Sequence, residues 1–288
     1  MSARAHRFGA RERGAAIILA LSVVALAALA ASAMMVSQGV WIRQMELSDG
    51  RTQGQFLIQA GVDWARAVLN YDRRTSSVDY LGEQWALRLP PIPFENGSLA
   101  GYLEDEQARF NLNDLVQNGK VDSAQLETFR RLLSILDLRP TLADMLGDWI
   151  AAGGRPLVDV SELARLSCFD EGTRARLAPF VAVLPRFTAV NVNTASPEVL
   201  AALVDGLGLD RARALVVQRE RAYFRSTSEF LDRLPPGLSV PSGAISVGSD
   251  YFMATIDANF GGAHARSLAL LARGELGGWP AIVWRRYL

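Results

Sequence analysis

A long uncharged segment near the amino terminus constrains the fold of this chain more than any other feature. No charged residue occurs between Ala15 and Ile42, and residues 15–36 are Ala, Ile, Leu, Val and Met apart from two serines. A helix over residues 15–36 is about 33 Å long, which is enough to cross the hydrocarbon core of a membrane. Four arginines precede the segment, and charges of both signs follow it. The positive-inside rule therefore predicts a transmembrane helix at 15–42 with residues 1–14 in the cytoplasm.

Three interpretations of this segment are open. A secretory signal peptide would be cut after a small-residue motif such as Ala31-Ser32-Ala33, and its apolar part would be lost. A plain signal anchor would remain uncut. A type IV pilin-like leader would be cut between Gly14 and Ala15 by a prepilin peptidase, and the apolar helix would stay. The sequence Arg-Glu-Arg-Gly at 11–14, followed by Ala-Ala-Ile-Ile-Leu, resembles this third type.

The fifth residue of such a mature chain is Leu19, whereas most pilin-like proteins have glutamate there. A carboxylate inside a bilayer is costly unless it is paired. The resemblance implies that the glutamate of other subunits meets the amino group of a neighbour in the filament. A subunit without it has no such partner to satisfy, which fits a position at the filament tip.

Composition excludes several classes of function. The chain has 288 residues, of which 50% are hydrophobic, so it can bury a large core and form two domains beyond the membrane. Its formal net charge is zero, which makes it a poor general ligand for nucleic acid or anionic lipid. Cys168 is the single cysteine, so no intrachain disulfide can form. We expect its thiol to be buried and inert.

No enzyme signature is present. The sequence lacks the zinc-protease, P-loop, nucleophile-elbow and Cys-x-x-Cys motifs, so we predict no catalytic residue and no cofactor. His264 is the one histidine outside the leader, and its Gly-Gly-Ala-His context predicts a solvated turn. Asp144 and Asp148 are four residues apart and form a possible carboxylate pair on one helix face, for which we expect a structural role.

The chain beyond the membrane segment predicts an α+β fold. Residues 43–70 continue the helix, and one apolar face is expected to pack on a globular domain: Met45, Phe56, Ala60, Trp64, Ala67 and Val68. Further predicted elements are a hairpin at 98–113, helices at 123–136 and 141–150, short capped helices starting near Val160 and Thr227, and strands at 251–258, 265–273 and 281–287. We therefore expect one α+β domain with an antiparallel sheet, made of residues 43–121 and 236–288. An all-α domain of residues 122–235 is inserted into it.

A helix-hairpin-helix-like motif is the sharpest local pattern in the inserted part. Its residues are Asn191, Asn193, Thr194, Gly206, Gly208 and Ala212. Ser196 as N-cap and Pro197 at the first position start one helix. The two glycines allow a tight reversal into a second helix near Asp210.

Such hairpins often bind nucleic-acid phosphate at the start of the second helix. Residues 191–235 contain equal numbers of arginines and acids, and Asp205 and Asp210 flank the hairpin itself. Carboxylates there would repel a phosphate, so we predict that the motif packs against protein and binds no nucleic acid. A membrane-anchored DNA receptor of the competence type remains the alternative function.

Three segments resemble the K-type minor pseudopilin of type II secretion, also called general secretion pathway protein K. They are Phe110-Asn-Leu-Asn113, Arg155-Pro-Leu-Val-Asp-Val-Ser-Glu-Leu163 and Asn191-Val-Asn-Thr-Ala-Ser-Pro-Glu-Val-Leu200. This family is also the one that lacks the glutamate at the fifth mature position. The resemblance implies a single-pass protein of the bacterial inner membrane with a periplasmic domain. It also implies assembly with I- and J-type minor pseudopilins and the major pseudopilin at the tip of the pseudopilus.

The resemblance further implies calcium in an acidic loop after an Asp-Trp-Ile-like segment. Asp148-Trp149-Ile150 is present here, but residues 151–156 read Ala-Ala-Gly-Gly-Arg-Pro and contain no acid. Because calcium takes about six to eight oxygen ligands, we predict no metal site on Asp148.

Overall fold

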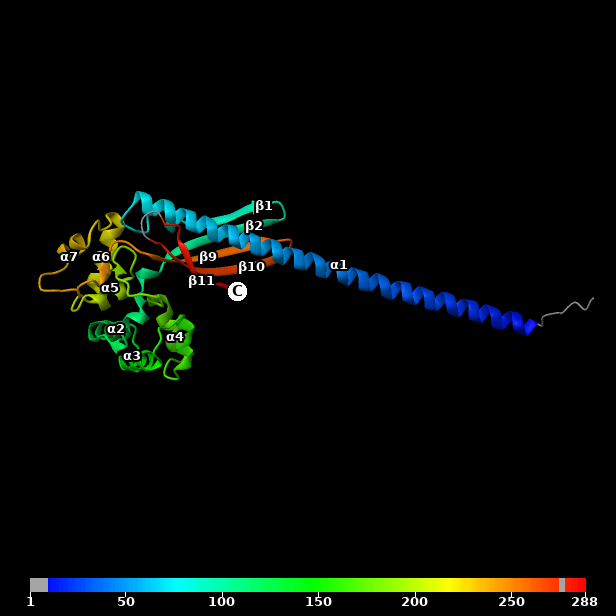
Figure 1. Ribbon diagram of the computed structural model, residues 1–288, viewed down its shortest axis with the longest axis horizontal. Coiled ribbons are helices and arrows are strands. Elements are labelled where there is room, and N and C mark those ends of the chain that lie inside the picture. The colour runs from blue at the N-terminus through cyan, green and yellow to red at the C-terminus, as the bar shows by residue number, and fades with distance from the viewer. Residues whose placement is uncertain (1–9, 275–277) are drawn as a thin grey trace, which may run out of the picture.

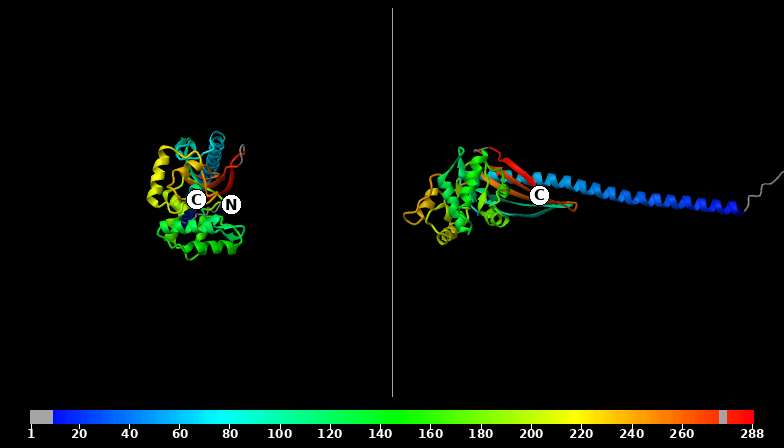
Figure 2. Two further views of the ribbon diagram at one scale, coloured as in Figure 1. Left: turned by 90° about the vertical axis from the view of Figure 1, so that its left-hand side faces the viewer. Right: turned by 90° about the horizontal axis from the view of Figure 1, so that it is seen from below.

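A computed structural model of the chain describes residues 10–274 and 278–288. Its first element is a single helix, α1 (Ala10–Thr75), which runs far out from the rest of the molecule (Figure 1). The stretch Ile17–Met45 is apolar and long enough to cross a membrane, and none of its most apolar window is buried. Residues 1–9 of the expected leader lie outside the described residues. The carboxyl-terminal half of α1 lies along a sheet (Figures 1 and 2).

This sheet has five strands, all antiparallel, in the order β1-β2-β9-β10-β11. The strands are β1 (Leu89–Phe94), β2 (Gly97–Asp105), β9 (Tyr251–Phe260), β10 (Ala263–Ala272) and β11 (Ala281–Tyr287). The last three match the predicted strands. The central strand β9 pairs with β2, from which it is separated by about half of the chain, so residues 106–250 leave the sheet and return to it.

The α1 face that packs on the sheet differs from the predicted one. Ile58, Val62 and Leu69 are fully buried against β2, β9 and β10. Gly61 lies on the same face, where a Cβ atom would come within 2.6 Å of the Ile256 side chain. Small residues let the helix approach the sheet closely. Of the face predicted from the sequence, Val68 packs against this core, whereas Phe56 and Trp64 are exposed.

The hairpin predicted at 98–113 is also wrong in position. The hairpin is β1–β2, its turn includes Asn96, and the acidic residues at 104–106 end β2 and enter a 3-10 turn. Strand β1 contains Pro90, Pro91 and Pro93. Proline is tolerated here because β1 is an edge strand, and one side of an edge strand needs no N–H donors.

Residues 106–250 form a helical part at the end of the sheet remote from the amino terminus of α1 (Figures 1 and 2). Its α-helices are α2 (Ser123–Ile135), α3 (Leu142–Gly153), α4 (Glu171–Leu177), α5 (Pro197–Leu203), α6 (Leu209–Arg221) and α7 (Thr227–Asp232). This part also contains two-residue strands that pair with one another: β3 (Phe110–Asn111) with β6 (Val181–Ala182), β4 (Val116–Gln117) with β5 (Lys120–Val121), and β7 (Val190–Asn191) with β8 (Ile245–Ser246). The same part contains the 3-10 helices η2 (Glu106–Ala108), η3 (Leu112–Leu115), η4 (Val160–Arg165) and η5 (Ala178–Phe180), whereas η1 (Gln84–Ala86) lies between α1 and β1.

The helical part has its own hydrophobic core, separate from the one between α1 and the sheet. This core includes Phe110, Leu112 and Ala244, which lie outside the expected limits of 122 and 235. The two short capped helices are present as η4 and α7. Their N-caps are Asp159 and Ser226.

Candidate functional site

The predicted hairpin motif has clear helix boundaries. The Ser196 side chain caps α5 by accepting a hydrogen bond from the Val199 N–H, with Pro197 at the first position. Gly206 and Gly208 have φ of 76° and 70°, which side chains with a Cβ rarely adopt, and Gly208 is the N-cap of α6. Ala212 on α6 is fully buried. The motif is therefore built into the core of the helical part.

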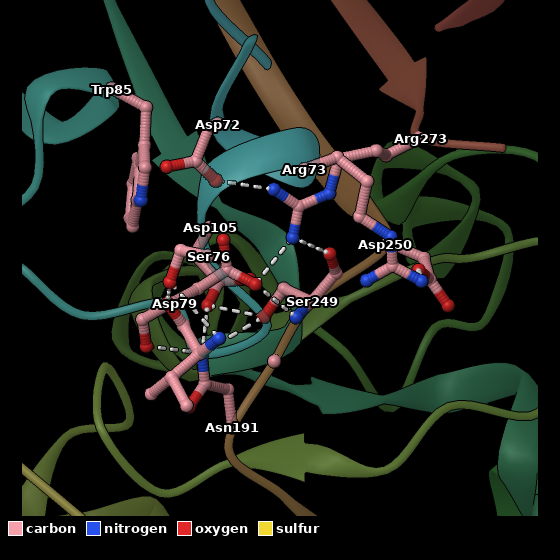
Figure 3. A network of polar contacts seen from close by, with 12 residues as sticks. Asp72, Arg73, Ser76, Asp79, Trp85, Asp105, Asn191, Ser249, Asp250 and Arg273 are labelled. Carbon is pink, nitrogen blue, oxygen red and sulfur yellow. Dashed lines mark hydrogen bonds and ion pairs between the residues drawn. The ribbon is translucent and has the colours of Figure 1, made fainter. Parts of the chain in front are cut away.

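Asn191, at the start of this motif, is completely buried and connects three separate segments (Figure 3). Its side-chain amide donates to the Asp79 carbonyl, to Asp105 Oδ2 and to Ser249 Oγ, each at 3.0 Å. These acceptors come from the loop after α1, the end of β2 and the loop before β9. Asn191 therefore fastens the helical part to the sheet.

The Asp105 carboxylate collects further hydrogen bonds at the same place. Its Oδ2 accepts from Thr194 Oγ1 at 2.6 Å and from Ser249 Oγ at 2.7 Å. Burial raises the pKa of Asp105 to about 6, although the hydrogen bonds from Thr194 and Ser249 oppose that shift. None of the ion pairs in the described part of the chain involves Asp105. The carboxylate is stabilised by neutral donors alone.

Arg273, just after β10, forms the other half of the network. Its guanidinium is almost fully buried, pairs with Asp72 Oδ2 of α1 at 2.6 Å and also pairs with Asp79. Burial disfavours the charge of Arg273, but Asp79 and Asp72 outweigh it and raise the pKa. The network of Figure 3 thus joins the end of α1, the sheet and the helical part through buried polar contacts. Breaking one partner of a buried ion pair is strongly destabilising.

The side chain of the second asparagine of the motif binds the backbone N–H and carbonyl of one distant residue. Asn193 Oδ1 accepts from the Phe224 N–H at 2.8 Å, and Asn193 Nδ2 donates to the Phe224 carbonyl at 2.9 Å. The earlier pair Asn111 and Asn113 has the same arrangement. There, Asn113 holds both the N–H and the carbonyl of Leu157, at 2.8 and 3.0 Å.

The similarity extends along both segments. In each pair the first asparagine accepts from the N–H of the second, at 3.2 Å for Asn111 and 3.0 Å for Asn191. Each first asparagine also lies on a two-residue strand in a parallel pair, β3 with β6 and β7 with β8. Glu162 and Glu229 accept from the backbone N–H four residues earlier, both at 2.9 Å. The helical part therefore consists of two units with the same internal hydrogen bonding, residues 110–184 and 190–248.

Acidic side chains lie on the exposed surface of the hairpin. Asp205 and Asp210 are both exposed beside the start of α6, and Asp210 pairs with Arg213 at 3.3 Å. Arg219, on the same helix, is buried and donates to the Val192 carbonyl at 2.7 Å. Burial lowers its pKa to about 10. One of the arginines of α6 is thus used inside the protein.

The other residues singled out by sequence lie apart from this network. Gly14 and Ala15 are within α1, and Leu19 is 67% exposed in its apolar stretch. Cys168 is partly rather than fully buried, because it packs at the edge of the helical core. His264 lies on β10 rather than in the preceding turn, with Nε2 at 3.5 Å from Asp257 Oδ1.

The carboxylate pair on α3 is not a joint site. Asp144 pairs with Arg130 of α2, whereas Asp148 is exposed. Within the described residues, the only group of three or more His, Cys, Asp or Glu side chains close enough to share a metal ion is Asp72, Asp79 and Glu83. Sequence analysis did not find this group, because its members are not spaced as in any known metal motif.

Comparisons with known proteins identify the family. A family model described as type II secretion system (T2SS), protein K, matches residues 190–248, and a second with the same description matches 108–186. These two matches coincide with the two similar units of the helical part. The chain is 32% identical over 92% of its length to the type II secretion system protein K of Pseudomonas aeruginosa, covering 90% of that protein. It is 30% identical over 96% of its length to that of Klebsiella pneumoniae, covering 97% of that protein.

A solved structure has the same fold. It is titled as the GspK-GspI-GspJ complex of the type 2 secretion system from enterotoxigenic Escherichia coli. The match has a TM-score of 0.73 and 22% identity and covers 85% of this chain and 99% of that one. This confirms the predicted α+β fold class, while the sequence relatives establish the family: the chain belongs to the type II secretion system protein K family.

Proposed function

We propose that this chain is a non-catalytic minor pseudopilin that caps the tip of the type II secretion pseudopilus together with I- and J-type minor pseudopilins. In this proposal Gly14–Ala15 is the prepilin peptidase site, α1 anchors the mature chain in the bacterial inner membrane, and the rest lies in the periplasm. The separate core of the helical part supports an inserted domain. Its packing favours limits near 109 and 248, wider than 122 and 235.

An exposed apolar stripe on α1 carries the proposal. Phe56, Trp64 and Tyr71 are 66%, 39% and 61% exposed, although the other face of the same helix is fully buried on the sheet. With Ala60 and Ala67 they follow i, i+4, i+8, i+11 and i+15 spacing, which places them on one side of a helix. From 56 to 71 the stripe is about 23 Å long at about 1.5 Å per residue.

We infer that this stripe receives the amino-terminal helix of another minor pseudopilin. Helices with such stripes pack side by side, and the membrane holds the anchors of neighbouring subunits parallel. The related structure is a complex that also contains GspI and GspJ, which supports partners of that kind. The full chain in detergent should co-purify with I- and J-type pseudopilins. Phe56→Arg with Trp64→Arg should reduce recovery at least tenfold, because a charge cannot enter the helix contact without a partner.

Val158→Arg is the matched control, since Val158 is 61% exposed but lies in the helical part. It should leave recovery unchanged. An equal loss of recovery in the stripe variant and in Val158→Arg would show that the stripe is not the contact surface.

Leu19 and the bulk of the helical part support the tip position. No other subunit lies above a subunit at the tip, so no neighbour needs a carboxylate from its helix. The bulky helical part would obstruct the addition of further subunits on that side. Overproducing the chain should therefore shorten pseudopili formed by the major pseudopilin. Longer filaments, or immunolabelling along the shaft, would show that the chain is not a cap.

A further inference from the structure

Three carboxylates meet where α1 ends. Asp72 belongs to the last turn of α1, Asp79 to the following loop, and Glu83 is the residue before η1. One oxygen from each lies within 4.8 Å of the other two. Asp79 is 1% exposed and Asp72 8%. Figure 3 shows Asp72 and Asp79 on either side of the guanidinium that binds both.

Each of these carboxylates has one oxygen occupied by fixed donors. Asp72 Oδ2 binds Arg273, and Asp79 Oδ2 binds Arg273 and the Ser249 N–H. Glu83 Oε2 accepts from Trp85 Nε1 at 2.8 Å and from the Tyr80 N–H at 3.0 Å. Asp79 Oδ1, by contrast, is fully buried and has no hydrogen-bond donor. A buried oxygen of a charged group without a hydrogen-bond donor is strongly unfavourable, so this atom is available to bind a cation.

The charges around the group do not balance. Arg273 is the cation that contacts it, and it faces three acids. A further positive charge at this point would stabilise all three carboxylates in their ionised form.

Two of the three carboxylates are accessible from outside. A cavity of about 710 Å³ lies beside it, and its lining includes Asp72 and Glu83 together with Tyr71, Ser76 and Tyr80. An ion can therefore enter and keep several water ligands. The lining contains no other charged side chain, so the two carboxylates set the charge of the cavity.

We propose that Asp72, Asp79 and Glu83 bind a calcium ion. The ligands are all oxygens, which excludes the nitrogen and sulfur sets preferred by zinc. Calcium accepts flexible geometry with Ca–O distances of about 2.4 Å, so two oxygens on opposite sides of one ion are about 5 Å apart. Magnesium demands a stricter octahedron with shorter bonds and uses one or two carboxylates. The proposal is independent of the tip position and uses residues remote in the chain from Asp148.

Calcium at this site would fix the loop between α1 and β1. The Asp79 N–H donates to the Val247 carbonyl, and the Asp79 carbonyl accepts from Asn191. A cation held by Asp72 and Asp79 therefore links the end of α1 to the attachment of the helical part. Bound calcium should accordingly stabilise that attachment as well as the loop.

Tb³⁺ luminescence on the full chain in detergent tests the site. Tb³⁺ replaces Ca²⁺ in oxygen sites and luminesces when a neighbouring excited indole transfers energy, and Trp85 contacts Glu83 directly. We expect sensitised luminescence that Ca²⁺ displaces and an equal concentration of Mg²⁺ does not. Glu83→Gln should weaken Ca²⁺ binding at least tenfold while keeping Trp85, so that loss of signal reports loss of the ion. Asp72→Asn should act likewise, and Asp148→Asn should change nothing.

Thermal unfolding of the unaltered chain gives a second measurement should these variants be unstable. Millimolar Ca²⁺ is expected to raise the Tm by about 5 °C, and the same Mg²⁺ by much less. A Tm that millimolar Ca²⁺ leaves unchanged would show that the group binds no calcium, and the proposal would be wrong. Ca²⁺ binding that survives both Glu83→Gln and Asp72→Asn, or that Asp148→Asn removes, would also overturn it.

Discussion

Asn191→Ala is expected to loosen the attachment of the helical part to the sheet. The substitution removes an NH2 group whose two N–H hydrogens are shared among three acceptors at 3.0 Å, one of them the Asp105 carboxylate. It also removes the Oδ1 atom that accepts from the Asn193 N–H. A neutral hydrogen bond contributes about 1 kcal/mol and one to a charged group about 2 kcal/mol. Because Asn191 is fully buried, water cannot easily replace the amide. We expect a loss of about 3–4 kcal/mol in the free energy of unfolding.

Thermal unfolding of the full chain in detergent measures this loss. For chains of this size 1 kcal/mol corresponds to about 2–4 °C, so the Tm should fall by roughly 6–15 °C. Asn259→Ala is the matched control. Asn259 is an exposed residue of β9 whose side chain makes one long contact with Ser98, at 3.4 Å, and its loss should move the Tm by less than about 2 °C. A drop for Asn191→Ala no larger than the control would refute the reading of Asn191 as a structural hub.

Three further predictions concern processing, ligands and pH. Gly14→Val should block cleavage before Ala15, which intact mass and amino-terminal sequencing would show; a mature start near Ser32 or Met34 would indicate a lost signal peptide. Labelled duplex DNA titrated at two salt concentrations should bind no better than to a neutral control protein, whereas micromolar binding with a steep salt slope would favour the DNA-receptor alternative. Burial raises the pKa of Asp105 to about 6 and of Glu106 and Asp114 to about 7. The folded state therefore binds more protons than the unfolded state from about pH 4 to pH 7, so stability should fall by at least about 2 kcal/mol between pH 5 and pH 8.

The sequence correctly predicts elements whose apolar residues repeat with a clear helical or strand spacing. It does not predict which face of a helix is buried when two faces are both apolar. The length of α1 follows from its uninterrupted apolar and helical spacing. Its buried face does not, because Ile58 and Val62 on one side and Phe56 and Trp64 on the other are all apolar. Hydropathy alone cannot tell which face meets the sheet of the same chain. Gly61 is the missed signal, since a glycine in a helix interior is costly unless a close approach requires it.

The polar network could not be predicted from sequence. Asp72, Asp105 and Arg273 come from segments separated by up to about 200 residues, and each looks like an ordinary surface charge in its local context. The repeat within the helical part left a readable signal. Asn111-Leu-Asn113 and Asn191-Val-Asn193 have the same spacing, as do the later Ser-Glu pairs that contain Glu162 and Glu229.

The buried polar contacts explain how the helical part keeps one orientation relative to the sheet. Apolar contacts are non-directional, and two hydrophobic cores joined by apolar contacts alone could slide over one another. Hydrogen bonds constrain both distance and angle. Asn191 and Arg273 together bind α1, β2 and the loop before β9, so a rotation of the helical part would break several buried bonds at once. A directional joint of this kind fixes the direction in which the helical part projects from α1. It accounts for polar residues at a place where burial alone would favour apolar ones.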